Sequence, residues 1–420
     1  MERNFMTTTK PFVIIGAGIA GVHAAESLRN EGYEGRIVLI DRDTQLPYDR
    51  PPLSKEYMLG ESSESNIYLR SHESFNTLRI ELKLGVEIVS IDAEKQIAIT
   101  SDGTIIEWEK LLFTTGSRLR QLQVKGSDLE EVHYLKTLSD ANNIRSKLDN
   151  VQQVVIVGAG FIGAELASSL KKLGKEVTIL ERMPLPLAHI LGEEMGEYFL
   201  HLHQSKGVNV ITGDSVVQFD GTSQVEKVLT ENGRVISCQA VIVGIGVIPN
   251  TLLSDEKLDV DRGYVVNEFG ETSLPNVYAA GDCAMWPYRG ANIHIEHWDH
   301  AVNHGKCVAK NMINEKSAPY SAIPYFWSDQ YDHRLQYFGH TKDWKSTVLR
   351  GNIEDQQFTY FYLNESDIVE AALLVNQPKN ALAVRRLVKQ QHPVHTDLLS
   401  NPDMSLKKVH LRANEDKVSY

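Results

Sequence analysis

Two stretches of the chain carry the same order of apolar and polar positions. Each begins with a short apolar run, "FVII" at 12–15 and "VVIV" at 154–157, and continues through closely spaced glycines into apolar residues at helical spacing. These helical residues are Val22, Ala25 and Leu28 in the first stretch and Ile162, Leu166, Leu170 and Leu173 in the second. Each stretch therefore predicts a buried strand, a glycine turn and an amphipathic helix.

The glycines follow the G-x-G-x-x-G spacing in both stretches. They are Gly16, Gly18 and Gly21 in the first and Gly158, Gly160 and Gly163 in the second. In this spacing the first glycine permits a tight turn, the second lets the backbone approach a pyrophosphate, and the third lets the helix pack on its strand. The free N–H groups at the start of the helix favour phosphate binding.

A second strand closes each unit with an acidic residue. "RIVLID" ends at Asp41 and "EVTILE" ends at Glu181, and an acid at this position accepts hydrogen bonds from ribose hydroxyls. We name residues 12–41 the first cradle and residues 154–181 the second cradle. The sequence thus predicts two dinucleotide sites, and a chain that holds two dinucleotides is most simply a flavoprotein that is reduced by a nicotinamide.

The C-terminal part of the chain, 325–420, carries a different pattern. Segments such as "QYFGHT", "STVLRGN" and "FTYFYLN" predict an antiparallel sheet, and "NALAVRRLVKQ" predicts a helix after it. We therefore predict an α/β fold with two Rossmann-like dinucleotide-binding domains and a C-terminal α+β domain that contains an antiparallel sheet.

Composition narrows the function classes. The 420 residues include 43 Lys and Arg against 55 Asp and Glu, and the formal net charge of −12 argues against a general nucleic-acid-binding protein. No apolar run approaches the ~18 residues that span a bilayer, and the opening "MERNFMTTTK" has no apolar stretch typical of a signal peptide. We expect a cytoplasmic protein whose partner is neither a nucleic acid nor a membrane.

The cysteines exclude one kind of redox chemistry. Cys238, Cys283 and Cys307 lie far apart in the sequence, and residues 1–237 contain no cysteine. A flavoprotein that passes electrons through a disulfide needs a thiolate beside the flavin, on the first helix after the FAD glycines or between the nicotinamide strands. We therefore expect electrons to leave from the flavin itself.

One histidine-rich segment raises the question of a metal. "HIEHWDHAVNH" contains His294, His297, His300 and His304, and the last two have helical ligand spacing. No glutamate lies between those two in the manner of H-E-x-x-H, so we predict no metal site.

Six further motifs resemble one family. They are "LPYDRPPLSK" (46–55), "TTGSRLR" (114–120), "VIVGIGVIPN" (241–250), "VYAAGDCA" (277–284), "IEHWDHA" (295–301) and "PYFWSDQY" (324–331). Together with the cradles they resemble the NADH-dependent ferredoxin and rubredoxin reductases of oxygenase systems, relatives of the apoptosis-inducing-factor flavoproteins. The resemblance implies that the first cradle binds FAD and the second binds NADH. It also implies a discontinuous FAD domain (1–118 and 245–324), an NAD domain (119–244) and a C-terminal domain (325–420).

The resemblance also implies which residues meet each cofactor. Those expected at FAD are Gly16, Gly18, Ala20, Gly21, Asp41, Arg42, Arg50, Lys55, Ile88, Thr115, Gly116, Arg118, Lys136, Asp282, Glu296 and Trp298. Those expected at NAD are Gly158, Gly160, Phe161, Ile162, Gly163, Glu165, Glu181, Gly244 and Gly246. Relatives often carry the first acid one residue after Asp41, where this chain has Arg42, and an arginine where it has Lys136.

Several of these residues receive a role from the resemblance. Asp282 would accept a hydrogen bond from the ribityl chain of the flavin, although a helix N-cap is an equally good local interpretation. Trp298 would begin a helix whose N-terminus stabilises negative charge on reduced flavin. Lys55 would lie near flavin N5 and pair with Glu165, whereas such a lysine is otherwise a solvated surface charge. We expect Lys55 and Glu165 to be the catalytic residues.

Two residues bear on specificity and on the route of the electrons. The carboxylate of Glu181 repels a 2′-phosphate and favours NADH over NADPH, a preference that Arg182 could reduce. Trp327 matches a family aromatic residue on the exposed side of the flavin, and the alternative is a core tryptophan.

Three functions remain open at this point. The first is a reductase that takes hydride from NADH onto FAD and passes electrons singly to a ferredoxin- or rubredoxin-type iron–sulfur protein, serving an oxygenase. The alternatives are an NADH-binding redox sensor of the apoptosis-inducing-factor kind and an NADH oxidase or a quinone or dye reductase. Arg385, Arg386 and Lys389 form a basic stripe that either docks an acidic ferredoxin or is an ordinary exposed helix face. We expect a monomer or a homodimer.

Overall fold

The computed structural model describes residues 10–253 and 255–410. The outer ends of the first and last predicted domains, 1–9 and 411–420, lie outside the described residues. Internal contacts divide the described chain into two compact units. The first unit holds residues up to 51 together with 63–120 and 247–322, and the second holds 52–62, 121–246 and the residues from 323 onward. The predicted boundaries of the three domains stay a prediction.

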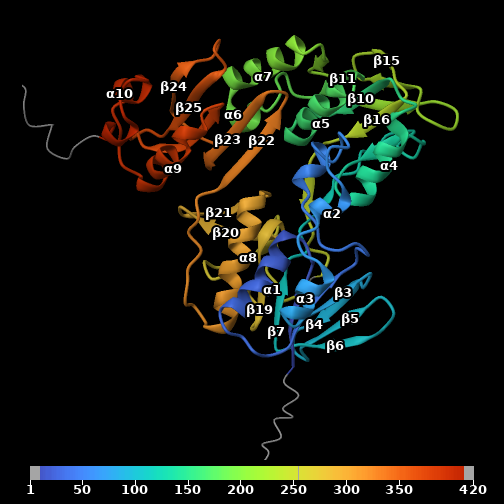
Figure 1. The fold of residues 1–420 in the computed structure, drawn as a ribbon, viewed down its shortest axis with the longest axis vertical. Helices are drawn as coiled ribbons and strands as arrows, with labels where there is room; N and C mark the ends of the chain where they lie inside the picture. The colour runs from blue at the N-terminus through green and yellow to red at the C-terminus, as the bar shows by residue number, and fades with distance from the viewer. Residues whose placement is uncertain (1–9, 254, 411–420) are drawn as a thin grey trace, which may run out of the picture. The chain divides into compact units, whose positions relative to one another are not determined.

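The first unit is built on a five-stranded parallel sheet with the order β19-β7-β1-β2-β3. These strands are β19 (Val277–Ala279), β7 (Lys110–Phe113), β1 (Phe12–Ile15), β2 (Ile37–Asp41) and β3 (Ile80–Leu84). Helices α1 (Ile19–Asn30) and α8 (Trp298–Ile313) lie side by side on one face of the sheet (Figure 1). The residues expected on the apolar face of α1 are buried there, as predicted.

Small antiparallel sheets cover the other face of this parallel sheet. One sheet contains β4 (Ile88–Asp92), β5 (Ile97–Thr100) and β6 (Ile105–Glu107), and another contains β18 (Tyr264–Val265), β20 (Ala284–Tyr288) and β21 (Ala291–His294). Strands β8 (Ser117–Leu119) and β17 (Val247–Pro249) pair with each other where the chain leaves and re-enters the unit. The short helices are α2 (Glu64–Ile67) and α3 (His72–Thr77).

The second unit repeats the same plan. Its parallel sheet has the order β12-β11-β10-β16-β9, with β12 (Asn209–Thr212), β11 (Glu176–Glu181), β10 (Gln153–Val157), β16 (Ala240–Val243) and β9 (Val132–Tyr134). A three-stranded antiparallel sheet precedes β16 in the sequence, as β4–β6 precede β7 in the first unit. Its strands are β13 (Val216–Asp220), β14 (Lys227–Thr230) and β15 (Val235–Ser237). The helices are α4 (Leu138–Leu148), α5 (Phe161–Lys172), α6 (Ala188–Leu191) and α7 (Glu193–Ser205).

The predicted apolar face of α5 is only half correct. Leu166 and Leu170 are buried, but Ile162 is 48% exposed and Leu173 is 37% exposed. Ile162 lies in the first turn of the helix, at the cradle, and Leu173 is the residue that follows the last turn. Small residues, Ala164 and Ala167, complete the buried face instead.

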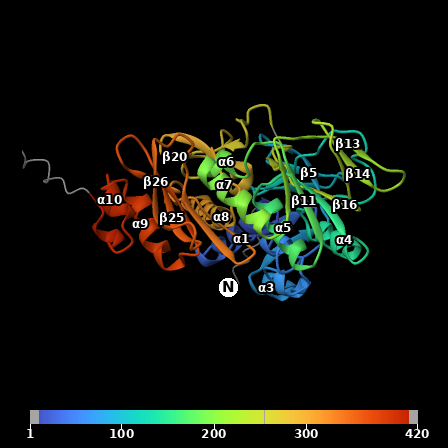
Figure 2. The same ribbon diagram turned by 90° about the horizontal axis from the view of Figure 1, so that it is seen from above.

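The C-terminal part forms the predicted antiparallel sheet, with the order β22-β23-β26-β25-β24. Its strands are β22 (Tyr325–Gln330), β23 (His333–Gly339), β24 (Ser346–Asn352), β25 (Gln357–Leu363) and β26 (Val369–Val375). Helices α9 (Ala381–Gln390) and α10 (Thr396–Ser400) pack on one face (Figure 2), and α6 and α7 pack on the other. Side chains alternate between the two faces, as Tyr337 and Phe338 do. The predicted fold class is confirmed.

No helix within 10–253 or 255–410 has the length and apolar character that crossing a membrane requires.

Candidate functional site

The first cradle requires glycine at two of its positions. Gly16 has φ +108°, and a Cβ atom added there would lie 2.2 Å from the carbonyl oxygen of Thr114. A Cβ atom added at Gly21 would lie 2.0 Å from the carbonyl oxygen of Gly16. The strand–helix turn and the packing of α1 on β1 therefore both depend on the absence of a side chain.

The middle glycine of the first cradle faces open space. A Cβ atom at Gly18 would meet nothing within 4 Å among the described residues, and Gly18 is the N-cap of α1 without a side chain that caps its N–H groups. An uncapped helix N-terminus beside an open glycine is the arrangement that receives a phosphate. The residues present therefore fit a dinucleotide.

The second cradle has the same geometry. Gly158 has φ +103°, and a Cβ atom there would lie 2.4 Å from the carbonyl oxygen of Gly244. A Cβ atom at Gly163 would lie 2.2 Å from the carbonyl oxygen of Gly158. Gly160 faces open space within the described chain and is the uncapped N-cap of α5. This cradle also fits a dinucleotide.

The acid of the first cradle is held at the glycine turn. Asp41 Oδ2 accepts a hydrogen bond from the backbone N–H of Ala17 at 2.6 Å, and Oδ1 accepts one from Asp43 at 2.9 Å. Arg42, where relatives often have the acid, points to solvent and lies 4.0 Å from Glu87. Asp41 therefore lies at the glycine turn, one residue before the position where relatives often carry the acid, and its contact with a ribose stays a prediction.

The acid of the second cradle makes the same two contacts. Glu181 Oε2 accepts a hydrogen bond from the N–H of Ala159 at 2.7 Å, and Oε1 accepts one from Met183 at 2.8 Å. The corresponding residues of the two cradles thus have corresponding partners. In both cradles the carboxylate lies beside the turn where a ribose would follow the pyrophosphate.

Two further predicted FAD residues lie at the end of the sheet in the first unit. Asp282 lies inside the 3-10 turn Gly281–Cys283, just after β19, and accepts a hydrogen bond from Ser117 Oγ at 3.2 Å. It caps no α-helix of the described chain, so the N-cap interpretation is wrong. Trp298 is the first residue of α8, as predicted, and its indole N–H donates to Asp49 Oδ1 at 2.8 Å.

The remaining predicted FAD residues divide between the two units. Ala20, Arg42, Arg50, Ile88, Thr115, Gly116, Arg118 and Glu296 belong to the first unit, whereas Lys55 and Lys136 belong to the second. Thr115 and Gly116 follow β7, next to the cradle, and Thr115 Oγ1 donates to the carbonyl of Asn250 at 2.6 Å. Their contacts to FAD stay predictions.

Lys55 and Glu165 meet in the second unit. Lys55 Nζ lies 3.8 Å from Glu165 Oε1 and 3.5 Å from Asp329 Oδ2. The side chain of Lys55 is 14% exposed and that of Glu165 is 5% exposed. Lys55 is therefore not a solvated surface charge but a largely buried ammonium with two carboxylates beside it.

Two serines, which the sequence did not single out, hold the Glu165 carboxylate. Ser54 Oγ donates to Oε2 at 2.6 Å, and Ser328 Oγ donates to Oε1 at 2.8 Å. Burial raises the pKa of Glu165, and the nearby Lys55 ammonium and the two hydroxyl hydrogen bonds oppose that shift. The carboxylate is thus stabilised by donors from two other segments of the chain.

Trp327 lies at the same cluster. Its ring centroid is 5.7 Å from Lys55 Nζ, and its side chain is only partly buried. An ammonium at this distance from an indole ring is attracted by the ring quadrupole. Trp327 is therefore not a fully buried core residue, and a position beside the flavin stays a prediction.

Comparison with known proteins gives the family. Residues 10–305 match the pyridine nucleotide-disulphide oxidoreductase family, and residues 325–410 match the reductase C-terminal family. The chain belongs to the pyridine nucleotide-disulphide oxidoreductases. This membership confirms the predicted family and the FAD and nicotinamide cofactors.

The relatives of this oxidoreductase are electron-transfer reductases. It is 36% identical to rhodocoxin reductase of Rhodococcus erythropolis over 94% of this chain and 93% of the relative. It is 34% identical to rubredoxin-NAD(+) reductase of Ectopseudomonas oleovorans over 90% of this chain and 98% of the relative. The solved structure of the covalent putidaredoxin reductase–putidaredoxin complex matches with a TM-score of 0.91 and 33% identity, covering 95% of this chain and 97% of that chain.

The three cysteines of this oxidoreductase are all free thiols. Burial raises the pKa of Cys283 to about 11 and that of Cys238 to about 12, and it also raises the pKa of Cys307. Because the thiolate is the reactive form, these three groups are poor nucleophiles near neutral pH.

The histidines of the oxidoreductase's α8 belong to a buried aromatic cluster. His300 and His304 pack with Trp286 and Tyr320, and His304 Nδ1 accepts a hydrogen bond from the N–H of Gly281 at 3.3 Å. Burial lowers the pKa of His304 to about 3. No group of three or more His, Cys, Asp or Glu side chains within the described residues is arranged to hold a metal ion.

Proposed function

We propose that this oxidoreductase binds FAD in the first cradle and NADH in the second, and passes electrons singly to a ferredoxin- or rubredoxin-type iron–sulfur protein that serves an oxygenase. The observation that carries the proposal is the presence of two complete cradles in a chain whose three cysteines are free, two of them buried and Cys307 half-buried. Bound FAD supplies the chemistry that accepts a hydride as two electrons and releases them one at a time. Relatives that are named as ferredoxin and rubredoxin reductases support this assignment.

The protein's own contribution is to position the cofactors and to stabilise charge. Asp282 is proposed to accept a hydrogen bond from the ribityl chain, and the N-terminus of α8 at Trp298 to face negative charge on the reduced ring. Lys55 is proposed to stabilise reduced flavin, with Glu165 as its counter-charge. The contacts of Lys55 and Glu165 within the second unit support this role.

Glu181 is proposed to select NADH over NADPH. Its carboxylate is fixed at the glycine turn by two backbone N–H groups, so it cannot easily move away from an incoming 2′-phosphate. Arg182, the next residue in the sequence, is exposed and carries the opposite charge. Selectivity is therefore a property of the second cradle.

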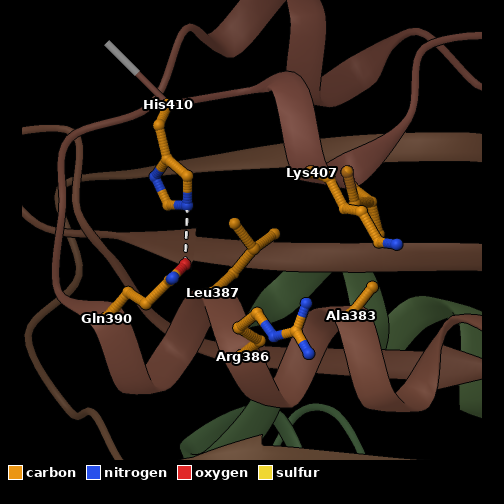
Figure 3. Close-up of a pocket in the computed structure, with 7 residues that line it drawn as sticks. Ala383, Arg386, Leu387, Gln390, Lys407 and His410 are labelled. Carbon is orange, nitrogen blue, oxygen red and sulfur yellow. Dashed lines mark hydrogen bonds between the residues drawn. The ribbon is translucent and has the colours of Figure 1, made fainter. Parts of the chain in front are cut away.

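A basic patch on the C-terminal sheet is proposed to dock the acidic iron–sulfur partner. It consists of Arg385, Arg386 and Lys389 of α9 with Lys407 and Lys408 at the short helix Leu406–Lys408, all exposed. Figure 3 shows Arg386 and Lys407 lining one surface pocket. A local positive patch on a chain of net charge −12 would steer an acidic partner.

An anaerobic stopped-flow experiment tests the function. NADH is mixed with the FAD-loaded protein, and the reduced protein is then mixed with purified ferredoxins or rubredoxins. Rapid flavin reduction followed by rapid reoxidation by a carrier supports the proposal. A long-lived long-wavelength band in air with a change of oligomeric state would favour a redox sensor, and fast aerobic turnover without a carrier would favour an oxidase or dye reductase.

A further inference from the structure

The backbone of Lys55 is attached to the second unit on both sides. Before it, the carbonyl of Ser54 accepts a hydrogen bond from Ser169 Oγ of α5 at 2.7 Å. After it, Tyr57 donates its hydroxyl to Asn142 of α4. The backbone of Lys55 is therefore held in place, and only its side chain is free to move between partners.

Glu165 does not depend on Lys55 for its hydrogen bonds. Its two oxygens already receive the hydroxyls of Ser54 and Ser328, and the N–H of Asp329 approaches Oε1 at 3.4 Å. The Lys55 ammonium, in contrast, is closer to the carboxylate of Asp329 than to that of Glu165. The counter-charge of Lys55 is consequently shared.

The two carboxylates differ in environment. The Glu165 side chain is 5% exposed, whereas the Asp329 side chain is 44% exposed. A largely buried ammonium is costly without compensation, and a second carboxylate at the rim of the cluster reduces that cost. Strand β22 brings this carboxylate to Lys55 together with the ring of Trp327.

We infer that Asp329 is a positioning residue, whose carboxylate acts as a second counter-charge and holds the Lys55 ammonium at the cluster with Glu165 and Trp327. The inference rests on the proposed function for its kinetic consequence only. Strand β22 of the C-terminal sheet would thus help to hold the Lys55 ammonium in place within the second unit.

Asp329→Asn tests the inference, because it removes the charge and keeps the shape. Asp332→Asn is the matched control: Asp332 lies three residues further on, in the turn between β22 and β23, and its carboxylate pairs with Lys206 at 3.0 Å rather than with Lys55. Asp329→Glu restores the charge. The first measurement is the rate at which an amine-acylating reagent labels Lys55 and Lys206 in the FAD-loaded protein, read by mass spectrometry.

Without the Asp329 charge the Lys55 ammonium is held less firmly at the cluster and is reached more easily by the reagent. We expect Asp329→Asn to raise Lys55 labelling about two- to fivefold with Lys206 unchanged, Asp332→Asn to affect Lys206 alone, and Asp329→Glu to restore the wild-type rate. Unchanged Lys55 labelling in Asp329→Asn would overturn the inference.

The second measurement is the anaerobic rate of flavin reduction by NADH. We expect Asp329→Asn to lower the limiting rate about two- to fivefold with little change in the NADH concentration for half-saturation, and Asp332→Asn to leave both unchanged. A slower rate without altered Lys55 labelling also contradicts the inference. If NADH fails to reduce the wild-type flavin, the proposed function is wrong, while the labelling result still decides whether Asp329 holds Lys55.

Discussion

The two cradles of this protein have the same backbone and different chemistry. In both, the first glycine lies against a carbonyl of the next parallel strand, and the closing acid accepts the N–H of the residue between the first two glycines. The position two residues after the last glycine differs, since it is His23 in the first cradle and Glu165 in the second. The two cradles therefore share the glycine geometry, whereas the side chain at this helical position differs between them.

The environments of these two side chains explain the difference. His23 lies 3.2 Å from Glu26 on its own helix, and Glu26 also pairs with Arg70 of the same unit. Glu165 instead points into a cluster formed by segments distant in sequence, with Lys55 and Ser328 among its partners. The first arrangement ties a helix to its own unit, and the second assembles a buried charge.

The cradles also differ at the residue that follows the neighbouring parallel strand, β7 in the first unit and β16 in the second. Thr114 Oγ1 donates to the carbonyl of Gly16 at 2.7 Å and contacts that of Ile15 at 3.1 Å. The second cradle has Gly244 at this place, which has no side chain. The hydroxyl of Thr114 therefore gives the first turn a side-chain contact that the second turn lacks at the corresponding position.

Alanine at the first glycine should break each cradle separately, and this is the largest effect that we expect. Gly16→Ala should give protein without bound FAD, and Gly158→Ala should give yellow protein that no longer binds NADH. The reason is the clash of the new Cβ atom with the carbonyl of Thr114 or Gly244, at a φ that disfavours alanine. Each should also lower the free energy of unfolding by about 1–3 kcal/mol.

Flavin absorbance and an NADH titration measure the two losses. Gly103→Ala is the control, since Gly103 has φ +83° but a Cβ atom there would meet no described atom within 4 Å. It should keep both cofactors. Loss of FAD in Gly158→Ala with NADH binding intact would mean that the two cradles have been assigned in the wrong order.

Removal of the Lys55 side chain should have the next largest effect. This effect should depend on the pair that Lys55 forms with Glu165 of the second cradle. Lys55→Ala should keep FAD and slow its reduction by NADH about 10–100-fold, because the ammonium that favours reduced flavin is lost. His23→Ala, at the corresponding position of the first cradle, should change that rate much less. Single-turnover absorbance at the flavin band measures the rate of flavin reduction in each variant. Equal slowing in the two variants would contradict a special role of the Lys55–Glu165 pair.

The same variant predicts a pH dependence of stability. Burial raises the pKa of Glu165 in the folded protein above its unfolded value, and the Lys55 ammonium opposes this rise. Between the two values the folded state binds more protons than the unfolded state, so stability falls as the pH rises through that window. Lys55→Ala should widen the window and make Tm fall more steeply above about pH 4. Adding Glu165→Gln should abolish the extra slope, and an unchanged slope would contradict the buried charge.

The parts of this comparison that sequence could predict are those with local signals. Glycine spacing and the closing acids lie within about thirty residues of each other, and their physics is that of one strand, one turn and one helix. The structure places Asp41 where Glu181 lies in the second cradle, although the family pattern alone made this residue doubtful. The alternating apolar segments of the C-terminal sheet were local signals as well.

The parts that sequence could not predict depend on distant segments. Ser54 is 111 residues from Glu165, and Ser328 is 163 residues from it. Ser328 and Asp329 lie inside the motif "PYFWSDQY", but neither has a periodicity that marks it as a partner of a buried charge. The covering of the C-terminal sheet by α6 and α7 had no local signal for the same reason, because those helices belong in sequence to the predicted NAD domain.

Replacement of the closing acid of each cradle by alanine should further separate the properties of the two cradles. Glu181→Ala should raise the KM for NADH about tenfold and reduce the preference over NADPH, because it removes both a ribose acceptor and a repulsive charge. Asp41→Ala should weaken FAD retention and leave the NADH/NADPH ratio unchanged. Steady-state kinetics with both nicotinamides measure the ratio. If the preference for NADH over NADPH is unchanged in Glu181→Ala, another residue distinguishes the two nicotinamides at the 2′ position.

The smallest expected effect is a difference in stability between variants at Thr114 and at Gly244, the corresponding positions of the two cradles. Thr114→Ala should lower the free energy of unfolding by about 1 kcal/mol, since the carbonyls of Gly16 and Ile15 each lose a hydroxyl partner in a buried turn. FAD affinity should fall slightly, and NADH binding should not change. Gly244→Ala is the counterpart in the second cradle: a Cβ atom there would have 3.8 Å to its nearest described neighbour, so the alanine fits and the variant should keep wild-type stability. Chemical denaturation of both variants measures the difference, and equal stability loss would show that the hydroxyl does not distinguish the two turns.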